Sequence, residues 1–240
     1  MCLRVKNIHF QFKEILEPML KKSVAEFIGT FGLVFAGTGA IMVNDITGGG
    51  VTHVGVGLTF GSIIAVMIFA TGHISGAHIN PAVTLGFAIT KHLPLKQVPY
   101  YLGSQIAGAI SASAVLLLLL GDVAELGATM PAGTDLQSFF IEILLTFFLM
   151  FVIMSVATDI RSVGQIAAIA IGATVGLEAI FAGPITGASM NPARSLGPAI
   201  VGWTWTSQWV YVLAPIIGAA AASVVYSWLR GKENYVGKDT

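Results

Sequence analysis

Six long apolar stretches restrict what this chain can fold into more than any other feature of its sequence. Each covers about 20 residues, and they lie at 23–43, 51–71, 97–120, 137–157, 164–183 and 207–229. An α-helix rises about 1.5 Å per residue, so a helix of this length crosses the roughly 30 Å hydrocarbon core of a bilayer. Only 10% of the residues are charged, whereas a soluble domain carries about 25%. The sequence therefore predicts an all-α membrane protein with six transmembrane helices.

The basic residues predict the orientation of these helices. Eleven of the twelve basic residues lie in alternate segments of the chain. Arg4, Lys6, Lys13, Lys21 and Lys22 precede the first apolar stretch, Lys91 and Lys96 follow the second, Arg161 follows the fourth, and Arg230, Lys232 and Lys238 end the chain. The alternate segments 44–50 and 121–136 contain no lysine or arginine. Loops rich in these residues stay on the cytoplasmic side, so both termini are expected there. Arg194 is the exception.

One polar segment occurs twice in this apolar chain, as ISGAHINPAVTLG at 74–86 and ITGASMNPARSLG at 185–197. Glu26-x-x-x-Thr30 before the first copy matches Glu142-x-x-x-Thr146 before the second, and Gly108-Ala109 and Gly218-Ala219 follow at similar spacing. Three spans per unit is an odd number, so the second unit is inverted relative to the first. We expect an inverted 3+3 repeat, with units at about 23–120 and 137–229, and a site near the bilayer midplane.

Each copy also contains a helix start. Proline is well tolerated at the first helical position and asparagine is a good cap, so Asn80-Pro81 and Asn191-Pro192 predict two helix N-termini. About ten helical residues after each box would rise about 15 Å, half the membrane thickness. Two such re-entrant half-helices could meet at the centre. Irregular backbone at that depth must line a polar cavity or be buried in protein.

These residues resemble those of the aquaporin or major intrinsic protein family, over nearly the whole chain. The resemblance rests on the two boxes Asn80-Pro81-Ala82 and Asn191-Pro192-Ala193, on a glutamate in a span before each box, and on the arginine directly after the second box. The segments FLMFVIMSVATD and AGPITGASMNPARSLGPA most resemble the corresponding segments of the plant nodulin-like intrinsic proteins and their microbial relatives.

The resemblance implies a passive channel for water and small uncharged solutes that excludes ions and protons. It also implies a homotetramer in the bilayer of the cell membrane, no cofactor and no enzymatic activity. On this basis residues 23–230 form one channel domain, with a cytoplasmic leader at 1–22 and a cytoplasmic tail at 231–240. The positive helix ends at Asn80 and Asn191 would orient solute oxygens and repel cations.

The family's narrowest constriction has four wall positions, which correspond here to Phe60, Ala179, Ala188 and Arg194. Water-selective members place a histidine where this chain has Ala179, so the ring is expected to be wider. Glycerol, urea, ammonia or neutral metalloid hydroxides would then pass besides water. Glycerol-specialised members typically have aspartate where this chain has Ser195, and two aromatic residues where it has one. A mainly water-selective channel therefore remains the alternative.

Glu26 and Glu142 are interpreted as supports for the re-entrant loops, since the family pattern favours backbone N–H contacts over proton transfer. Gly61 and Gly172 occupy matching points of the second and fifth spans and are expected to allow close helix packing. Glu178 is left open, as either a vestibule residue or a helix contact.

The histidines are expected to be structural. His78 is expected to support the first loop or line the cytoplasmic half of the pore. Metal binding by His73 and His78 would need a further ligand, and none is evident. His53 is interpreted as a surface residue at the outer rim. The single cysteine, Cys2, provides no disulfide framework.

Other functions fit less well. A secondary transporter also uses inverted repeats and broken helices, but it would need an intramembrane charge for a coupling ion. A non-conducting scaffold would not need intact motifs, and no catalytic constellation for an enzyme is evident. The net charge of zero gives no reason to expect a nucleic-acid partner.

Overall fold

The computed structural model describes residues 2–159 and 166–231, with side chains from Glu17 onward. Arg161, Lys232 and Lys238, which contribute to the predicted orientation, lie outside these ranges, as does nearly all of the predicted tail. The side chains of Arg4, Lys6 and Lys13 also lie outside them.

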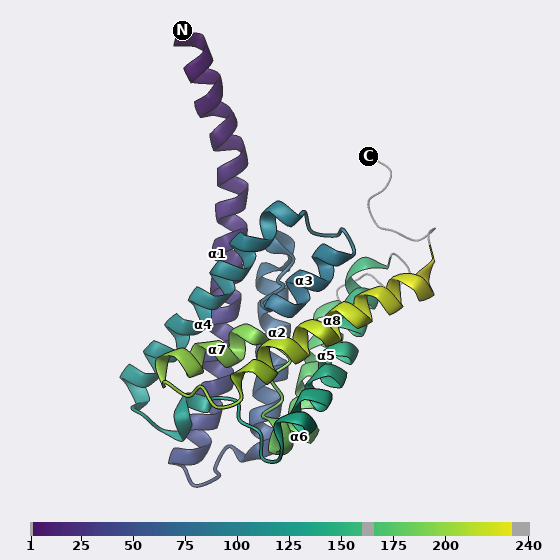
Figure 1. Ribbon diagram of the computed structural model, residues 1–240. Helices are drawn as coiled ribbons and strands as arrows, with labels where there is room; N and C mark the ends of the chain where they lie inside the picture. The colour runs from purple at the N-terminus through teal and green to yellow at the C-terminus, as the bar shows by residue number, and fades with distance from the viewer. Residues whose placement is uncertain (1, 160–165, 232–240) are drawn as a thin grey trace.

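The six predicted spans are confirmed as six long apolar helices within the described residues. They are α1 (Cys2–Ile46), α2 (Thr52–Ser75), α4 (Val98–Leu120), α5 (Asp135–Thr158), α6 (Ala167–Thr186) and α8 (Gln208–Arg230). A single turn, η1 (Leu95–Gln97), leads into α4. Because α1 begins at Cys2, the leader continues the first span as one helix, which extends beyond the bundle in Figure 1.

Two short helices follow the Asn-Pro-Ala boxes, α3 (Pro81–Ile89) and α7 (Pro192–Val201). Their caps are the asparagines: Asn80 Oδ1 accepts a hydrogen bond from the Ala82 N–H at 2.8 Å, and Asn191 Oδ1 accepts from the Ala193 N–H at 3.0 Å. At about 1.5 Å per residue, neither helix is long enough to cross a bilayer. Both are therefore half-helices, as the sequence predicts.

The helix contacts follow the inverted repeat. In the first unit α1 packs on α2 and α4, and in the second α5 packs on α6 and α8. Each half-helix packs chiefly against the last span of the other unit, α3 on α8 and α7 on α4, which Figure 1 shows in the middle of the bundle. The two units are thus interlocked around the two boxes.

Helices α2 and α6 form the closest contact between the two units. A Cβ on Gly61 would lie 2.5 Å from the Gly172 carbonyl oxygen, and a Cβ on Gly172 would collide with the Gly61 carbonyl oxygen. Any larger residue at either position would push the helices apart. This close crossing places the inner faces of α2 and α6 on the same central space.

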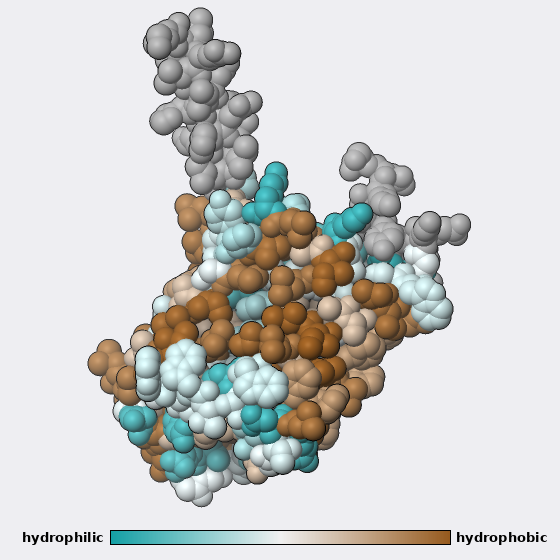
Figure 2. Space-filling model, viewed as in Figure 1, coloured by the Kyte–Doolittle hydropathy of each residue, from teal (hydrophilic) through white to brown (hydrophobic). Residues whose placement is uncertain are grey.

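The outer surface is apolar where the bundle would contact lipid. Large aliphatic and aromatic side chains are exposed on the long helices, among them Leu118, Phe148, Leu177 and Phe181. Figure 2 shows a broad hydrophobic band across the visible face, with more polar residues gathered toward its two ends. Such a band is costly in water and stable in a bilayer, so the fold is that of a multi-pass membrane protein.

Candidate functional site

The loops before the two boxes have the same unusual backbone. The C-cap residues of α2 and α6 are Gly76 and Gly187, both in the left-handed region with φ of 89° and 85°. Left-handed φ then recurs at Ala77 and Ile79 in the first loop, and at Ala188 and Met190 in the second. Each such non-glycine residue costs roughly 1–3 kcal/mol and persists only where surrounding contacts hold it.

Glu26 provides those contacts for the first loop. Its side chain is fully buried in α1. Oε1 accepts hydrogen bonds from the Ser75 hydroxyl at 2.7 Å and the His78 N–H at 2.9 Å, and Oε2 accepts from the Ile79 N–H at 2.7 Å. Gln105 Nε2 of α4 donates to Oε2 at 2.7 Å. The carboxylate thus receives two donors on each oxygen and ties three elements together.

Glu142 in α5 occupies the equivalent place in the second loop. Its Oε1 accepts from the Thr186 hydroxyl at 2.7 Å and the Ser189 N–H at 2.9 Å, and its Oε2 accepts from the Met190 N–H at 2.9 Å. The side chain is also fully buried. These are the contacts that a loop-supporting glutamate requires, in both units.

The two boxes are bonded to each other. Asn80 Nδ2 donates to the Met190 carbonyl oxygen at 2.7 Å, and Asn191 Nδ2 donates to the Ile79 carbonyl oxygen at 2.9 Å. Each asparagine therefore caps its own half-helix with Oδ1 and holds the opposite loop with one amide N–H. A second N–H remains on each Nδ2. The N-termini of α3 and α7 consequently meet at the centre of the bundle.

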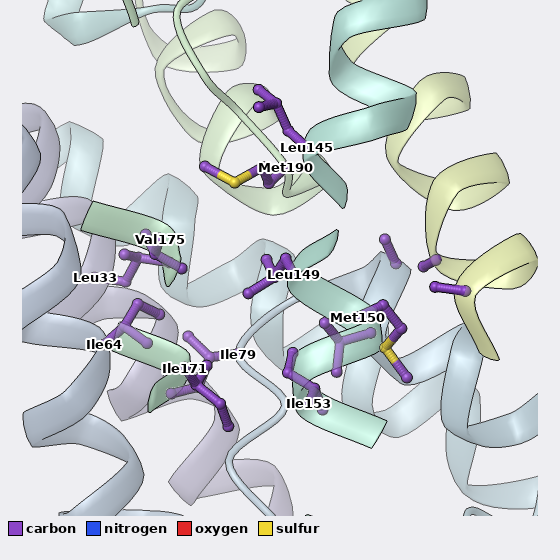
Figure 3. Close-up of a cluster of buried hydrophobic side chains, with 14 of the residues drawn as sticks. Leu33, Ile64, Ile79, Leu145, Leu149, Met150, Ile153, Ile171, Val175 and Met190 are labelled. Atoms are coloured by element: carbon purple, nitrogen blue, oxygen red, sulfur yellow. The ribbon is translucent and has the colours of Figure 1, made fainter. Parts of the chain in front are cut away.

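An inner cavity of about 110 Å³ passes these two asparagines. Part of its lining is polar and comes from the re-entrant loops and the start of α7, including His78, Asn80, Ser189, Asn191 and Arg194. Much of the rest is apolar and comes from the long helices; Figure 3 shows several of these side chains: Leu33, Ile64, Leu149, Ile153, Ile171 and Val175. At about 10–15 Å³ of probe volume per water, this space has room for several water molecules.

A second, outer cavity of about 470 Å³ lies at the other end of the loops. It is lined by residues from α1, α2, α6 and the segment after η2 (Ala124–Gly127), among them Asn44, His53, Met130 and Pro184. Four residues line both cavities: Phe60, Ala179, Ala188 and Arg194. These are the four positions expected for the constriction, and they mark the boundary between the two spaces.

Arg194 is held in place at this boundary. Its Nη1 donates to the Gly127 carbonyl oxygen at 2.8 Å, and its guanidinium carbon lies 5.0 Å from the centre of the Phe60 ring. Its Nε is buried and has no hydrogen-bond partner among the described residues. The Phe60 ring occupies the space that a side chain on Gly37 would fill. The positive charge and the aromatic face thus have fixed positions.

His78 lies at the opposite end of the inner cavity. Its ring packs 4.6 Å from the ring of Phe87 and 4.8 Å from that of Tyr101, and its Nδ1 lies 3.1 Å from the Thr84 hydroxyl. His92 lies beyond Phe87, and burial, together with the charge of Arg230, lowers its pKa. Both effects favour the neutral form of His92.

Three features could not be found from sequence. The carbonyl that holds Arg194 belongs to Gly127, in a turn with left-handed residues that carries no recognisable motif. Ser195, which departs from the aspartate of glycerol-specialised members, lines neither cavity. Its hydroxyl instead bonds the hydroxyls of Thr129 at 2.8 Å and Ser189 at 2.6 Å. Hydroxyl networks of this kind depend on residues far apart in sequence.

The third feature is the environment of Glu178 and of the histidines of α2, His53 and His73. Glu178 is buried, lines neither cavity, and its Oε2 has no hydrogen-bond partner within the described part of the chain. His53 does lie at the rim, but its ring bonds the backbone of α6 rather than facing only solvent. His73, at the other end of α2, is exposed.

Comparisons with known proteins agree with this geometry. The family model described as major intrinsic protein matches residues 14–226. The chain is 49% identical to aquaporin NIP1-1 of Oryza sativa subsp. japonica, over 89% of this chain and 75% of that protein. It is 48% identical to nodulin-26 of Glycine max, over 93% of this chain and 83% of that protein.

A solved structure has the same fold. The aquaglyceroporin from Plasmodium falciparum superposes with a TM-score of 0.79 at 27% sequence identity, covering 87% of this chain and 95% of that chain. The resemblance to the nodulin-like proteins and to the inverted six-span fold is therefore confirmed.

Proposed function

This chain belongs to the major intrinsic protein family and is a membrane channel for water and small neutral solutes; from that premise we propose that glycerol is among its solutes. We further propose that Phe60, Ala179, Ala188 and Arg194 form the selecting ring. The observation that carries this proposal is that these four residues line both the inner and the outer cavity. A solute that moves from one cavity to the other passes between them.

The chemistry of the ring fits a small polyol. Arg194 offers N–H donors to hydroxyl oxygens on one side, and its charge opposes cations. Phe60 offers a flat apolar face to carbon–hydrogen groups. Ala179 and Ala188 are small and leave the remaining walls open. Urea, ammonia and neutral metalloid hydroxides share the uncharged, hydrogen-bonding character that such a ring accepts.

The boxes supply the second selective element of the proposal. The N-termini of α3 and α7 meet where Asn80 and Asn191 bond the opposite loops. Two positive helix ends at one depth repel cations and hydronium, and the remaining N–H on each Nδ2 can donate to a passing oxygen. Glu26 and Glu142 act as loop supports, which their contacts with backbone N–H groups favour over proton transfer.

The placement of the protein follows from charge and family. We propose residues 23–230 as the channel domain, with residues 1–22 and 231–240 on the cytoplasmic side of the cell membrane. The support is the distribution of lysine and arginine among the loops. A homotetramer with one pore in each subunit is the assembly that the family implies, and native mass spectrometry in detergent would test it.

Stopped-flow light scattering on proteoliposomes tests the solute proposal. Water and glycerol permeability are measured in one preparation and compared with empty liposomes. We expect both to exceed the empty-liposome rate, and glycerol entry to rise linearly with its gradient. Fast water flow with glycerol at the empty-liposome level would refute the open ring and favour a water-selective channel. Saturable entry that depends on a proton or sodium gradient would favour a secondary transporter.

A further inference from the structure

Helix α6 contains a proline near its C-terminal end, close to the proposed selecting ring. Pro184 lies in the last turn of α6, four residues after Ile180. Proline has no N–H, so the Ile180 carbonyl loses the donor that a regular helix would supply from that position. A backbone carbonyl that loses its helical donor takes another partner, from the protein or from water. This carbonyl belongs to the residue directly after Ala179.

His53 replaces the missing donor from another helix. Its Nε2 lies 2.6 Å from the Ile180 carbonyl oxygen. Because a carbonyl only accepts, Nε2 carries the proton in this contact. The imidazole ring of His53 fits against α6 because residue 183 is glycine: a Cβ there would lie 2.8 Å from His53 Cε1. Proline, glycine and histidine are thus complementary parts of one contact.

The proline of this contact occurs in α6 and has no counterpart in α2. The two re-entrant loops can be aligned on the helix-ending glycines, Gly76 and Gly187. Pro184 then corresponds to His73, which has its own N–H. The first unit therefore has no proline that would leave a carbonyl unpaired at this point. The unpaired carbonyl is therefore a feature of α6 and not of the repeated sequence pattern.

The contact joins the two helices that carry opposite parts of the ring. His53, Gly57 and Gly61 are spaced four residues apart on α2 and form one stripe along its contact with α6. Gly57 and Gly61 bring the backbones together, and a Cβ on Gly57 would lie 3.1 Å from the Ile180 backbone nitrogen. His53 is the member of this stripe that lies nearest the N-terminal end of α2. Phe60 lies on the same helix, and Ala179 lies next to Ile180.

We propose that His53 is a positioning residue that sets the width of the ring by tying the outer end of α2 to α6 at the kink of Pro184. The inference rests on the proposed selecting ring. Without the tie, the segment of α6 that leads to Ala179 and Ala188 is free to move away from Phe60. The ring then opens and admits glycerol more readily, whereas water, being smaller, gains less.

The test is the ratio of glycerol to water permeability in proteoliposomes that contain His53→Ala. A ratio measured in one preparation does not depend on how many channels are folded, so a merely structural loss would leave it unchanged. We expect a rise of about fivefold, the size associated with one ordinary hydrogen bond. His73→Ala is the matched control, since it removes an exposed histidine from the same helix, and its ratio should equal that of the unmodified channel.

Three further variants locate the effect. His53→Gln keeps an N–H at a similar reach and should restore most of the original ratio. Gly183→Ala forces the histidine ring away and should act like His53→Ala. Pro184→Ala returns an N–H to the helix, so adding His53→Ala in that background should change the ratio little.

The outcomes separate the inference from the proposed function. An unmodified channel that fails to conduct glycerol would refute the proposed function. An unmodified channel that conducts, with the ratio unchanged or lowered in His53→Ala and Gly183→Ala, would overturn the role of His53 alone. An equal effect of His53→Ala with and without Pro184→Ala would also overturn it, because the histidine would then act through something other than the Ile180 carbonyl. If His53→Ala does not fold, Gly183→Ala decides by the same criterion.

Discussion

Replacing Glu142 by glutamine should disrupt the second loop although the side chain keeps its size. The carboxylate accepts from Thr186 and Ser189 on one oxygen and from Met190 on the other. Glutamine has one acceptor and one donor group. In either orientation its NH₂ faces a backbone N–H, that of Ser189 or that of Met190, which loses its acceptor.

The expected magnitude is the cost of one unpaired buried donor. A buried donor left without a partner costs about 1–3 kcal/mol. The left-handed backbone of Met190, with φ of 53°, already costs roughly 1–3 kcal/mol in the unmodified channel, so the loop depends on these hydrogen bonds. A loss of about 2 kcal/mol shifts the ratio of ordered to displaced loop by roughly 30-fold. The shift reaches the first box, because the Met190 carbonyl accepts from Asn80 Nδ2.

The assay pairs thermal unfolding in detergent with water permeability in proteoliposomes. Glu142→Gln should lower both the apparent melting temperature and the permeability per folded channel. Glu26→Gln should do the same at least as strongly, since Glu26 accepts a fourth hydrogen bond from Gln105. Glu125→Gln, at an exposed position of η2, is the control and should change neither. Unchanged stability and flux in Glu142→Gln would refute the loop-support reasoning.

Further predictions concern the ring and one buried tyrosine. Ala179→His should narrow the ring and reduce glycerol flux more than water flux in stopped-flow assays; equal loss of both would contradict the assignment. Arg194→Ala should raise glycerol permeability relative to water severalfold and let ions leak, and an unchanged solute profile would remove this residue from the ring. Tyr211→Phe removes a 2.6 Å hydrogen bond to the Thr186 carbonyl oxygen and should cost about 1 kcal/mol of stability. The exposed Tyr100→Phe is its control in thermal unfolding, and equal stability of the two would count against that bond.

The spans and the half-helices could be predicted because local sequence determines them. Apolar runs of about 20 residues need only length and composition to indicate a transmembrane helix. Asn80-Pro81 and Asn191-Pro192 supply a cap and a fixed φ at a helix start. The odd number of spans per unit then determines the inversion.

The ring residues could be placed only through the family's pattern. No local feature of Phe60, Ala179 or Ala188 distinguishes them from other residues on apolar helices. They come together because α2, α6 and the second loop converge on the boundary between the two cavities. Arg194 alone carried a signal of its own, as a charge that fits no cytoplasmic loop.

The contacts that hold the site in shape were decided by tertiary structure. The Gly127 carbonyl binds Arg194 from 67 residues away, and the Ile180 carbonyl binds His53 from 127 residues away. Each asparagine box bonds the carbonyl that precedes the other box, across 110 or 112 residues. Backbone carbonyls have no sequence signature, since every residue has one. A proline four residues later, such as Pro184, indicates a carbonyl without its helical donor, but which side chain reaches a carbonyl depends on how the helices pack.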